Sequence, residues 1–260
     1  MLRILVATPA GGGMVTLQYH QSFVQTMEKV YLVNDKARAE GRPPDLYVGT
    51  YTLQNESLIS RGRNHCAQIA LKQGWDRLFF IDADAGWTWE QFAAVAGATA
   101  YPIIAGTCPL KTYPISMNYL PFQEDEHYYK DAVRSIESLW AMRKGHSSPF
   151  IKVPFVGTAF MCIDVGVFKK LAETCSPYQY PNPHTGQLET HWDFFSTTPV
   201  AKKYMSEDWG FCHLARKAGF DVHIHADVQI THTGAHTFRC PPMPPPVVEP
   251  LPEAKTMEKI

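Results

Sequence analysis

The N-terminal part of the chain alternates between short apolar runs and longer amphipathic stretches, and this alternation limits the fold more than any other feature. The apolar runs are too short for helices and are bounded by glycine or proline, which predicts strands. Strands that alternate with helices form a mostly parallel sheet with helices on its faces. The predicted strands are residues 3–7, 45–51, 78–81 and 102–107, and the predicted helices are residues 17–39, 64–73 and 88–100.

Three side chains stand where these strands end, and ligands of open parallel sheets bind beyond such carboxyl ends. They are Thr8, Tyr51 and Asp82. Residues 8–13 include three consecutive glycines, which let a backbone approach a ligand closely or simply form a flexible turn. This stretch lacks both the Lys-Ser/Thr of a P-loop and the full Gly-x-Gly-x-x-Gly spacing, so it is no nucleotide fingerprint.

Asp82 and Asp84 follow the buried strand 78–81. Side chains alternate along a strand, so we expect both carboxylates on one side. Two neighbouring acids are costly to desolvate unless a cation or hydrogen-bond donors compensate them. Oxygen ligands suit Mg²⁺ or Mn²⁺. The alternative is a turn that leads into a helix, since Thr88 and Gln91 have capping-box spacing.

Arg61, Arg63 and Asn64 precede the predicted helix 64–73. Guanidinium groups and free N–H groups at a helix start favour phosphate oxygens. A solvated basic turn would have the same sequence, so both interpretations stay open at this stage.

The second half of the chain is less regular. Residues 108–149 are rich in aromatic side chains. These side chains would suit a surface that binds sugar rings or bases. The alternative is an ordinary connecting segment that contains a hairpin and one helix. An apolar strand pair is predicted at 150–163, broken at Gly157 and Thr158, and a helix at 164–173. Residues 175–199 contain no recognisable element and are predicted to form a mobile lid.

A second pair of acids opens the next helix. Ser206 fits an N-cap, Glu207 and Asp208 lie in the first turn, and Gly219 fits the C-terminal stop. Capping alone explains both acids. A strand follows at 220–228.

Metal-binding side chains also occur on this strand, where His223, His225 and Asp227 alternate. One strand face does not supply a complete tetrahedral set, which disfavours zinc.

Charge and cysteine content indicate the cellular compartment in which the protein works. A formal charge of −1 gives no global basic field, and six cysteines without a Cys-x-x-Cys pair predict reduced thiols in a cytoplasm. Neither a signal peptide nor a membrane anchor is expected. We expect one domain over residues 1–238 and an extended or disordered proline-rich tail over residues 239–260.

Taken in order, these motifs resemble those of the metal-dependent glycosyltransferases with the GT-A fold, a Rossmann-like α/β fold with a mostly parallel sheet, flanking helices and a small antiparallel portion. The resemblance runs over nearly all of residues 1–238. It is carried by residues 60–64, 82–84, 156–159, 207–209 and 232–234.

The resemblance implies a nucleotide-diphosphate sugar donor, with a UDP-sugar favoured and a GDP-sugar as the alternative. Asp84 would ligate Mn²⁺ or Mg²⁺, Asp82 would contact the ribose or a metal-bound water, and His232 would be a further ligand. The donor-binding residues would be Thr8 and Pro9 at the base, Arg61, Arg63 and Asn64 at the diphosphate, and Gly157 and Thr158, with Trp209 and Trp87 as apolar walls.

The resemblance also implies a catalytic pair. Asp208 would act as general base on the acceptor hydroxyl, and Glu207 would bind sugar hydroxyls, although the two acids could exchange roles.

The setting implied is the cytoplasm of a bacterium or of a phage-infected cell. The acceptor would be a glycan, a protein or a modified DNA base. DNA would require a basic rim, whose candidates are Arg134, Arg143, Lys144, Lys152, Lys169, Lys170, Lys202 and Lys203.

Two alternatives of other classes stay open. A metal-dependent nucleotidyltransferase would share the sheet and the acids, but it would need a triphosphate grip near Gly11–Gly13. A non-catalytic nucleotide- or sugar-binding protein would bind a ligand without turnover.

Overall fold

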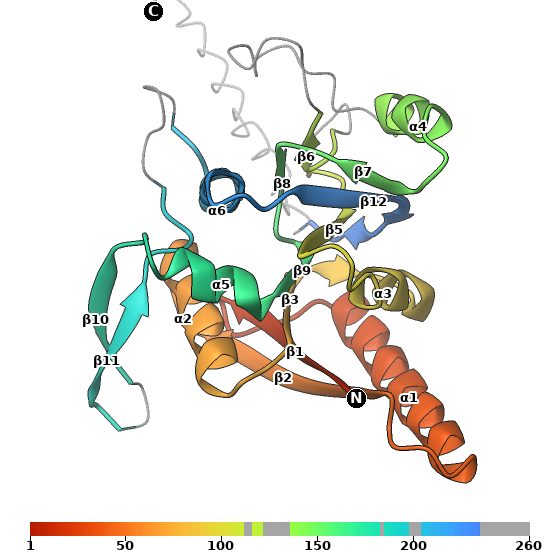
Figure 1. Ribbon diagram of the computed structural model, residues 1–260, viewed down its shortest axis with the longest axis horizontal. Coiled ribbons are helices and arrows are strands. Elements are labelled where there is room, and N and C mark those ends of the chain that lie inside the picture. Colours follow the sequence, from red (N-terminus) through yellow and green to blue (C-terminus); the bar gives the residue numbers. More distant parts are fainter. Residues whose placement is uncertain (112–115, 122–135, 183–184, 198–203, 235–260) are drawn as a thin grey trace, which may run out of the picture.

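The computed structural model describes residues 1–111, 116–121, 136–182, 185–197 and 204–234, and its centre is a seven-stranded sheet (Figure 1). The strands are β1 (Leu2–Ala10), β2 (Leu46–Gln54), β3 (Arg77–Ile81), β5 (Ile103–Thr107), β7 (Phe150–Lys152), β9 (Phe160–Asp164) and β12 (Val222–Gln229). They lie in the order β2-β1-β3-β9-β5-β12-β7.

Five of these strands run in one direction. β1 is parallel to β2 and β3, and β5 is parallel to β12. β9 is antiparallel to both of its neighbours, β3 and β5, and β7 is antiparallel to β12. The predicted mostly parallel sheet with a small antiparallel portion is confirmed. Because β9 is reversed, the residues before it lie at the same edge of the sheet as the carboxyl ends of β3 and β5.

Helices cover both faces of the sheet. α1 (Leu17–Ala39) and α3 (Trp89–Ala96) pack on one face. α2 (Ile59–Lys72), α5 (Val165–Leu171) and α6 (Glu207–Lys217) pack on the other, as Figure 1 shows. α4 (Ile136–Lys144) lies beside β12.

Alternation along the strands builds a core on each face. In β3, Leu78 and Phe80 join the α2, α5 and α6 face, whereas Phe79 and Ile81 join the α1 and α3 face. All four side chains are fully buried, which fits a central strand covered on both sides.

Three small pairs complete the described structure. β10 (Pro177–Pro181) pairs with β11 (Leu188–Trp192), β4 (Ala85–Gly86) with β13 (Thr231–His232), and β6 (Tyr119–Leu120) with β8 (Phe155–Val156).

The prediction of a loop without strands over residues 175–199 is wrong for its described part, because β10 and β11 form an antiparallel hairpin. That this segment acts as a mobile lid stays a prediction. Pro177 and Pro181 mark the ends of β10, where an edge strand tolerates the missing donor.

The end of β1 also differs from expectation. β1 continues to Ala10, so Thr8 and Pro9 lie in the strand and not in a loop. β3 pairs with β1 only as far as Ala7, so no ladder bond to β3 is lost where Pro9 lacks an N–H.

α2 begins at Ile59, five residues before the predicted start at Asn64. Gly62 looks like a breaker, yet it lies inside the helix. A Cβ there would come within 3.2 Å of Leu53 and 3.3 Å of Glu56, so the glycine allows the first turn to pack closely against β2 and the following loop.

The start of α3 agrees with its sequence signal. The capping box between Thr88 and Gln91 is present, with Gln91 N–H donating to Thr88 and the Gln91 amide accepting from Thr88 N–H. The helix ends at Ala96, earlier than the predicted residue 100.

Some expectations lie outside the described residues, namely the tail 239–260 and the rim residues Arg134, Lys202 and Lys203. Among the described helices, none has the length and apolarity needed to cross a membrane.

Candidate active site

The two acids after β3 lie in a turn and not on the strand. The strand ends at Ile81, and Ala85 N–H donates to Asp82 C=O to close the turn. The prediction that alternation along a strand places Asp82 and Asp84 on one side is therefore wrong. The backbone of the turn is held from three directions, by Thr16, Ala159 and Thr233.

Asp84 contacts two nitrogen groups. Lys111 Nζ lies 2.5 Å from Oδ2, and His232 Nε2 lies 3.2 Å from Oδ1. Burial would raise the pKa of Asp84, but the hydrogen bonds from His232 and Lys111 outweigh it and lower the pKa to about 2. This carboxylate stays ionised throughout the neutral range.

His232 is placed by β13, whose pairing with β4 sets it opposite Ala85. Its Nδ1 lies 2.8 Å from Pro109 C=O, which fixes the ring orientation. The hydrogen bond to Asp84, followed by the influence of Cys108, raises the pKa of His232 to about 10.

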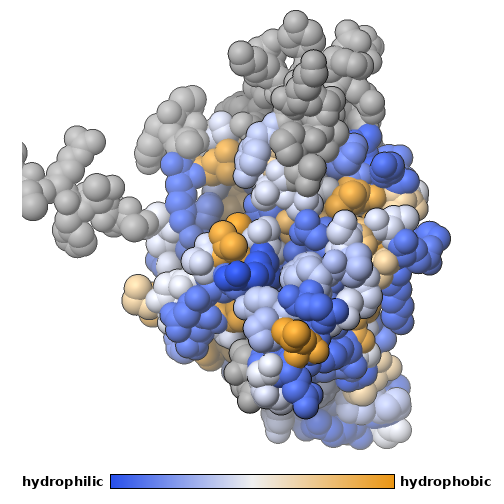
Figure 2. Space-filling model, turned by 90° about the vertical axis from the view of Figure 1, so that its left-hand side faces the viewer, coloured by the Kyte–Doolittle hydropathy of each residue, from blue (hydrophilic) through white to orange (hydrophobic). Residues whose placement is uncertain are grey.

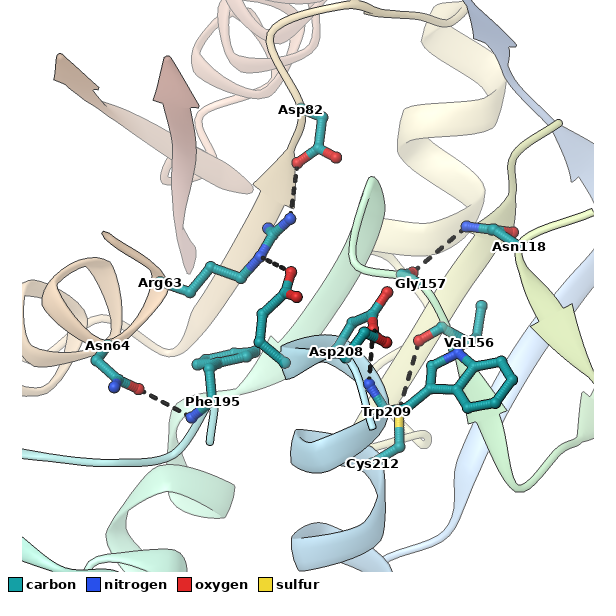
Figure 3. A network of polar contacts seen from close by, with 12 residues as sticks. Arg63, Asn64, Asp82, Asn118, Val156, Gly157, Phe195, Asp208, Trp209 and Cys212 are labelled. Atoms are coloured by element: carbon teal, nitrogen blue, oxygen red, sulfur yellow. Dashed lines mark hydrogen bonds and ion pairs between the residues drawn. The ribbon is translucent and has the colours of Figure 1, made fainter. Parts of the chain in front are cut away.

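Arg63 connects the turn to α6. Its Nη2 lies 3.2 Å from Asp82 Oδ1 and its Nε lies 3.3 Å from Glu207 Oε1, while the guanidinium stacks 5.4 Å above the Phe80 ring. The side chain is 5% exposed. Burial would lower the pKa of Arg63, but the negative charges of Asp82 and Glu207 raise it above its ordinary value. Figure 3 shows this side chain reaching toward Asp82.

Asp208 has a different environment from Glu207. Its Oδ1 accepts hydrogen bonds from Ser206 Oγ and from Trp209 N–H. Burial raises the pKa of Asp208, and the Ser206 hydrogen bond partly opposes that rise. Within the described part of the chain Asp208 has no salt-bridge partner, whereas Glu207 pairs with Arg63. Ser206 is the N-cap residue as predicted, but its hydroxyl bonds to Asp208 and not to the helix backbone.

Gly157 brings the loop before β9 against this carboxylate. A Cβ at Gly157 would lie 3.2 Å from Asp208 Oδ2 and 3.0 Å from Asn118 Nδ2. Gly157 N–H donates to Asn118 C=O at 2.7 Å, and Asn118 Oδ1 accepts from Cys108 N–H at 2.8 Å. Thr158 is buried beside it, at 1% exposure. Figure 3 shows Gly157 between Asn118 and Asp208.

The two arginines of the predicted diphosphate grip are not brought together. Whereas Arg63 points to Asp82 and Glu207, Arg61 makes a two-point ion pair with Glu56 and lies over the Tyr180 ring. Residues two apart on a helix project about 200° apart, which explains the separation.

Asn64 has a structural position. It donates to Asp193 and accepts from Phe195 N–H, tying α2 to the segment after β11. With Arg61 it lines a cavity of about 280 Å³ beside Tyr178.

The face of the molecule that carries the β10–β11 hairpin is mainly hydrophilic with isolated hydrophobic side chains (Figure 2).

The remaining predicted donor residues differ in accessibility. Thr8 is 1% exposed and hydrogen-bonds Tyr19 at 2.6 Å, and Pro9 is half-buried. Trp209 stacks on Phe155 with ring centroids 5.1 Å apart. Trp87 is 5% exposed within the core, so the prediction that it forms a wall of the site is wrong.

Sequence reasoning missed Lys111 and Asn118. Neither belongs to a recognisable motif, and both fall in the irregular stretch after β5. The only local signal was position, because residues that follow β5 lie at the same edge of the sheet as Asp82.

Zinc finds no support on β12. His223 packs against Tyr101 and His225 against Phe150, while Asp227 pairs with Arg143. No three His, Cys, Asp or Glu side chains gather into a metal-binding group within the described residues.

Comparison with solved structures identifies the fold. The chain aligns with GalNAc-T7, solved with UDP, GalNAc and Mn²⁺, at 11% identity and a TM-score of 0.52, covering 89% of this chain and 44% of that one. The chain has the GT-A fold. It thus spans less than half the length of the GalNAc-T7 chain.

Two further structures are similar at lower scores. A197 from STIV aligns at 14% identity and a TM-score of 0.47, covering 90% of this chain and 86% of that one. TarS 1–349 from S. aureus in complex with UDP-GlcNAc aligns at 13% identity and 0.42, covering 90% and 59%. No family model and no curated protein matches the sequence.

In this GT-A fold, a divalent metal would find two protein ligands at the sheet edge. Asp84 and His232 are already in contact, whereas Asp82 is held by Arg63. Small hard cations keep several waters and substrate oxygens among their ligands, so one carboxylate and one imidazole fit such an ion when a substrate supplies the rest, provided that His232, whose pKa is raised by Asp84, releases the Nε2 proton as the metal binds.

Proposed function

We propose that the protein is a glycosyltransferase that moves a sugar from a nucleotide-diphosphate donor, preferably a UDP-sugar, to an acceptor hydroxyl. The single observation that carries the proposal is the chain of contacts from Asp82 through Arg63 to Glu207. It joins the Asp84 turn to the start of α6, where Asp208 has no salt-bridge partner in the described structure. The GT-A fold supports the same proposal.

In this proposal the Asp84 end of the site holds the diphosphate. Mn²⁺ or Mg²⁺ bound there would act as a Lewis acid that stabilises charge on the departing diphosphate. Asp84 and His232 would hold the metal, and Pro109 C=O would keep the His232 ring in place. Arg63 would fix Asp82 for the ribose side of the donor.

Asp208 acts as the general base. As the acceptor oxygen attacks the anomeric carbon, its proton passes to the carboxylate, which burial has made more basic. Glu207 is already ion-paired with Arg63, so we assign Asp208 as the base and Glu207 as the positioning group.

Calorimetric titration of UDP and GDP, with and without Mn²⁺, tests the donor site. We expect one nucleotide to bind in a way that needs both Mn²⁺ and Asp84. Asp84→Ala should abolish the metal dependence, and Asp221→Ala is the matched control because Asp221 pairs with Lys152 on the surface. Absence of binding for every nucleoside diphosphate would overturn the proposal.

Turnover then separates the alternatives. Asp208→Asn should reduce kcat for UDP-sugar hydrolysis or transfer by about 10²- to 10⁴-fold with little change in UDP affinity. Asp227→Asn is its control. Pyrophosphate release from a nucleoside triphosphate and a sugar phosphate would instead indicate a nucleotidyltransferase, and ligand binding without turnover would indicate a binding protein.

The geometry does not favour DNA among the acceptors. Arg143, Lys152 and Lys170 of the predicted basic rim each pair with an acid, respectively Asp227, Asp221 and Glu173. The acceptor is therefore proposed only as a hydroxyl-bearing molecule.

A further inference from the structure

Both oxygens of Asp84 are engaged before any substrate is present. Lys111 Nζ lies 2.5 Å from one oxygen and His232 Nε2 lies 3.2 Å from the other. Asp84 is one-third exposed and Lys111 is 39% exposed, so a metal ion from solvent can reach this carboxylate. It would meet a positive charge already in place.

The second acid of the turn is paired with a cation as well. Asp82 is paired with Arg63, which is buried and held a second time by Glu207. Each carboxylate of the turn therefore has its own cation.

Lys111 can leave Asp84 without disturbing His232. The backbone before it is fixed, because Pro109 bridges to Met117 and Leu110 N–H donates to Ser116 C=O at 2.6 Å. The lysine stem passes Gly234, where a Cβ would lie 3.7 Å from Lys111 Cδ. Only the flexible four-carbon side chain has to turn, while Pro109 C=O keeps its contact with the His232 ring.

We propose that Lys111 is a built-in cation that competes with a divalent metal for Asp84 and moves to a phosphate oxygen when a nucleoside diphosphate binds. This inference rests on the proposed donor site. It assigns to Lys111 a role in metal affinity and donor coupling.

The mechanism makes metal and nucleotide binding cooperative. A metal that binds alone must displace the Lys111 ammonium group from the Asp84 carboxylate. The displaced ammonium group then contacts only water. When a diphosphate arrives with the metal, the displaced ammonium gains phosphate oxygens, which offsets the lost contact with Asp84. Metal should therefore bind weakly alone and tightly with the nucleotide.

Mn²⁺ binding to the 260-residue chain without nucleotide is the direct test, measured from the electron paramagnetic resonance signal of free Mn²⁺. Lys111→Met keeps the length of the side chain and removes its charge. We expect it to tighten Mn²⁺ binding by about tenfold or more. Lys111→Arg keeps the charge and should leave Mn²⁺ affinity close to that of the parent. Lys152→Met, which breaks the surface pair with Asp221, is the matched control.

The second measurement is UDP affinity at saturating Mn²⁺. Because Lys111→Met has no ammonium to place on a phosphate oxygen, UDP should bind about fivefold to tenfold more weakly. Opposite signs for the Mn²⁺ and UDP effects distinguish a competing cation from a residue that merely supports the loop.

Unchanged or weaker Mn²⁺ binding in Lys111→Met would overturn the inference, as would tighter UDP binding. Lys111→Gln is a second neutral variant, should the methionine disturb folding. If the proposed donor site does not exist, the result is different. In that case no nucleoside diphosphate binds to the parent protein, with or without Mn²⁺, whatever the lysine variants do to Mn²⁺ affinity.

Discussion

Arg63 and Glu207 lie 144 residues apart in the chain, and their side chains meet 3.3 Å apart in the interior of the protein. The same guanidinium also holds Asp82 at 3.2 Å. One buried cation therefore sets the distance between the turn after β3 and the first turn of α6, which carry the proposed donor and acceptor chemistry.

Replacing Arg63 should destabilise the protein strongly. Arg63→Met leaves Asp82 and Glu207 without their buried cation, and breaking a buried ion pair on one side costs about 3–5 kcal/mol. The control is Arg143→Met, whose partner Asp227 is 51% exposed and whose own side chain is 32% exposed, so its loss should stay below about 1 kcal/mol. Urea unfolding followed by circular dichroism measures both. Equal losses for the two variants would contradict this account of Arg63.

Removing the Ser206 hydroxyl should shift the pH dependence of catalysis. The hydrogen bond from Ser206 lowers the pKa of Asp208 and opposes the rise caused by burial. Without it the pKa rises further above 3.8, so the base becomes protonated at higher pH. In Ser206→Ala the acid limb of the kcat/KM profile should move to higher pH, with activity retained on the plateau. An acid limb at the parental position would show that Asp208 does not control it.

A methyl group at Gly157 should impair activity more than stability. The added Cβ would approach Asp208 Oδ2 to 3.2 Å and Asn118 Nδ2 to 3.0 Å, so the carboxylate must shift. We expect Gly157→Ala to cost about 1–3 kcal/mol of unfolding free energy and to lower kcat at least about tenfold. Gly12→Ala is the control, because its Cβ would meet no atom within 4 Å. Thermal unfolding measures the stability of both variants, and steady-state kinetics measures their kcat. Full activity in Gly157→Ala would contradict the claim that close contact with Gly157 sets the position of Asp208.

His191 should make the hairpin β10–β11 sensitive to acid. The ring is 1% exposed, and burial, followed by the neighbouring His65, lowers its pKa from 6.5 to about 4. Between these two pH values the unfolded chain binds a proton at His191 that the folded protein does not bind. The free energy of unfolding therefore falls as pH falls from about 6.5 toward 4. In His191→Phe the difference in unfolding free energy between pH 7 and pH 5 should shrink.

The groups that face His191 are His65, Glu189, Lys72, Tyr178 and Tyr180. The control is His20→Phe, which replaces an exposed histidine on α1. If the pH difference is the same in the parent, His191→Phe and His20→Phe, another group causes the acid sensitivity.

Local sequence signals were sufficient for most of the framework. The capping box of α3, the apolar run of β3 and the first-turn acids of α6 are each read within a few residues, and all three elements begin within about one residue of the predicted position, although α3 ends earlier than predicted. Their alternation also predicted a mostly parallel sheet, because strand and helix periods are properties of consecutive residues.

Tertiary structure decided which charged groups meet. Arg61 and Arg63 look equivalent in the sequence, but the early start of α2 sends them to different partners. Lys111 has no motif, and it meets Asp84 only because β3 and β5 end at the same edge of the sheet. Asn118 likewise reaches Gly157 through the pairing of β6 with β8. Ion pairs between distant residues depend on the register of strands and the rotation of helices, which no short stretch of sequence contains.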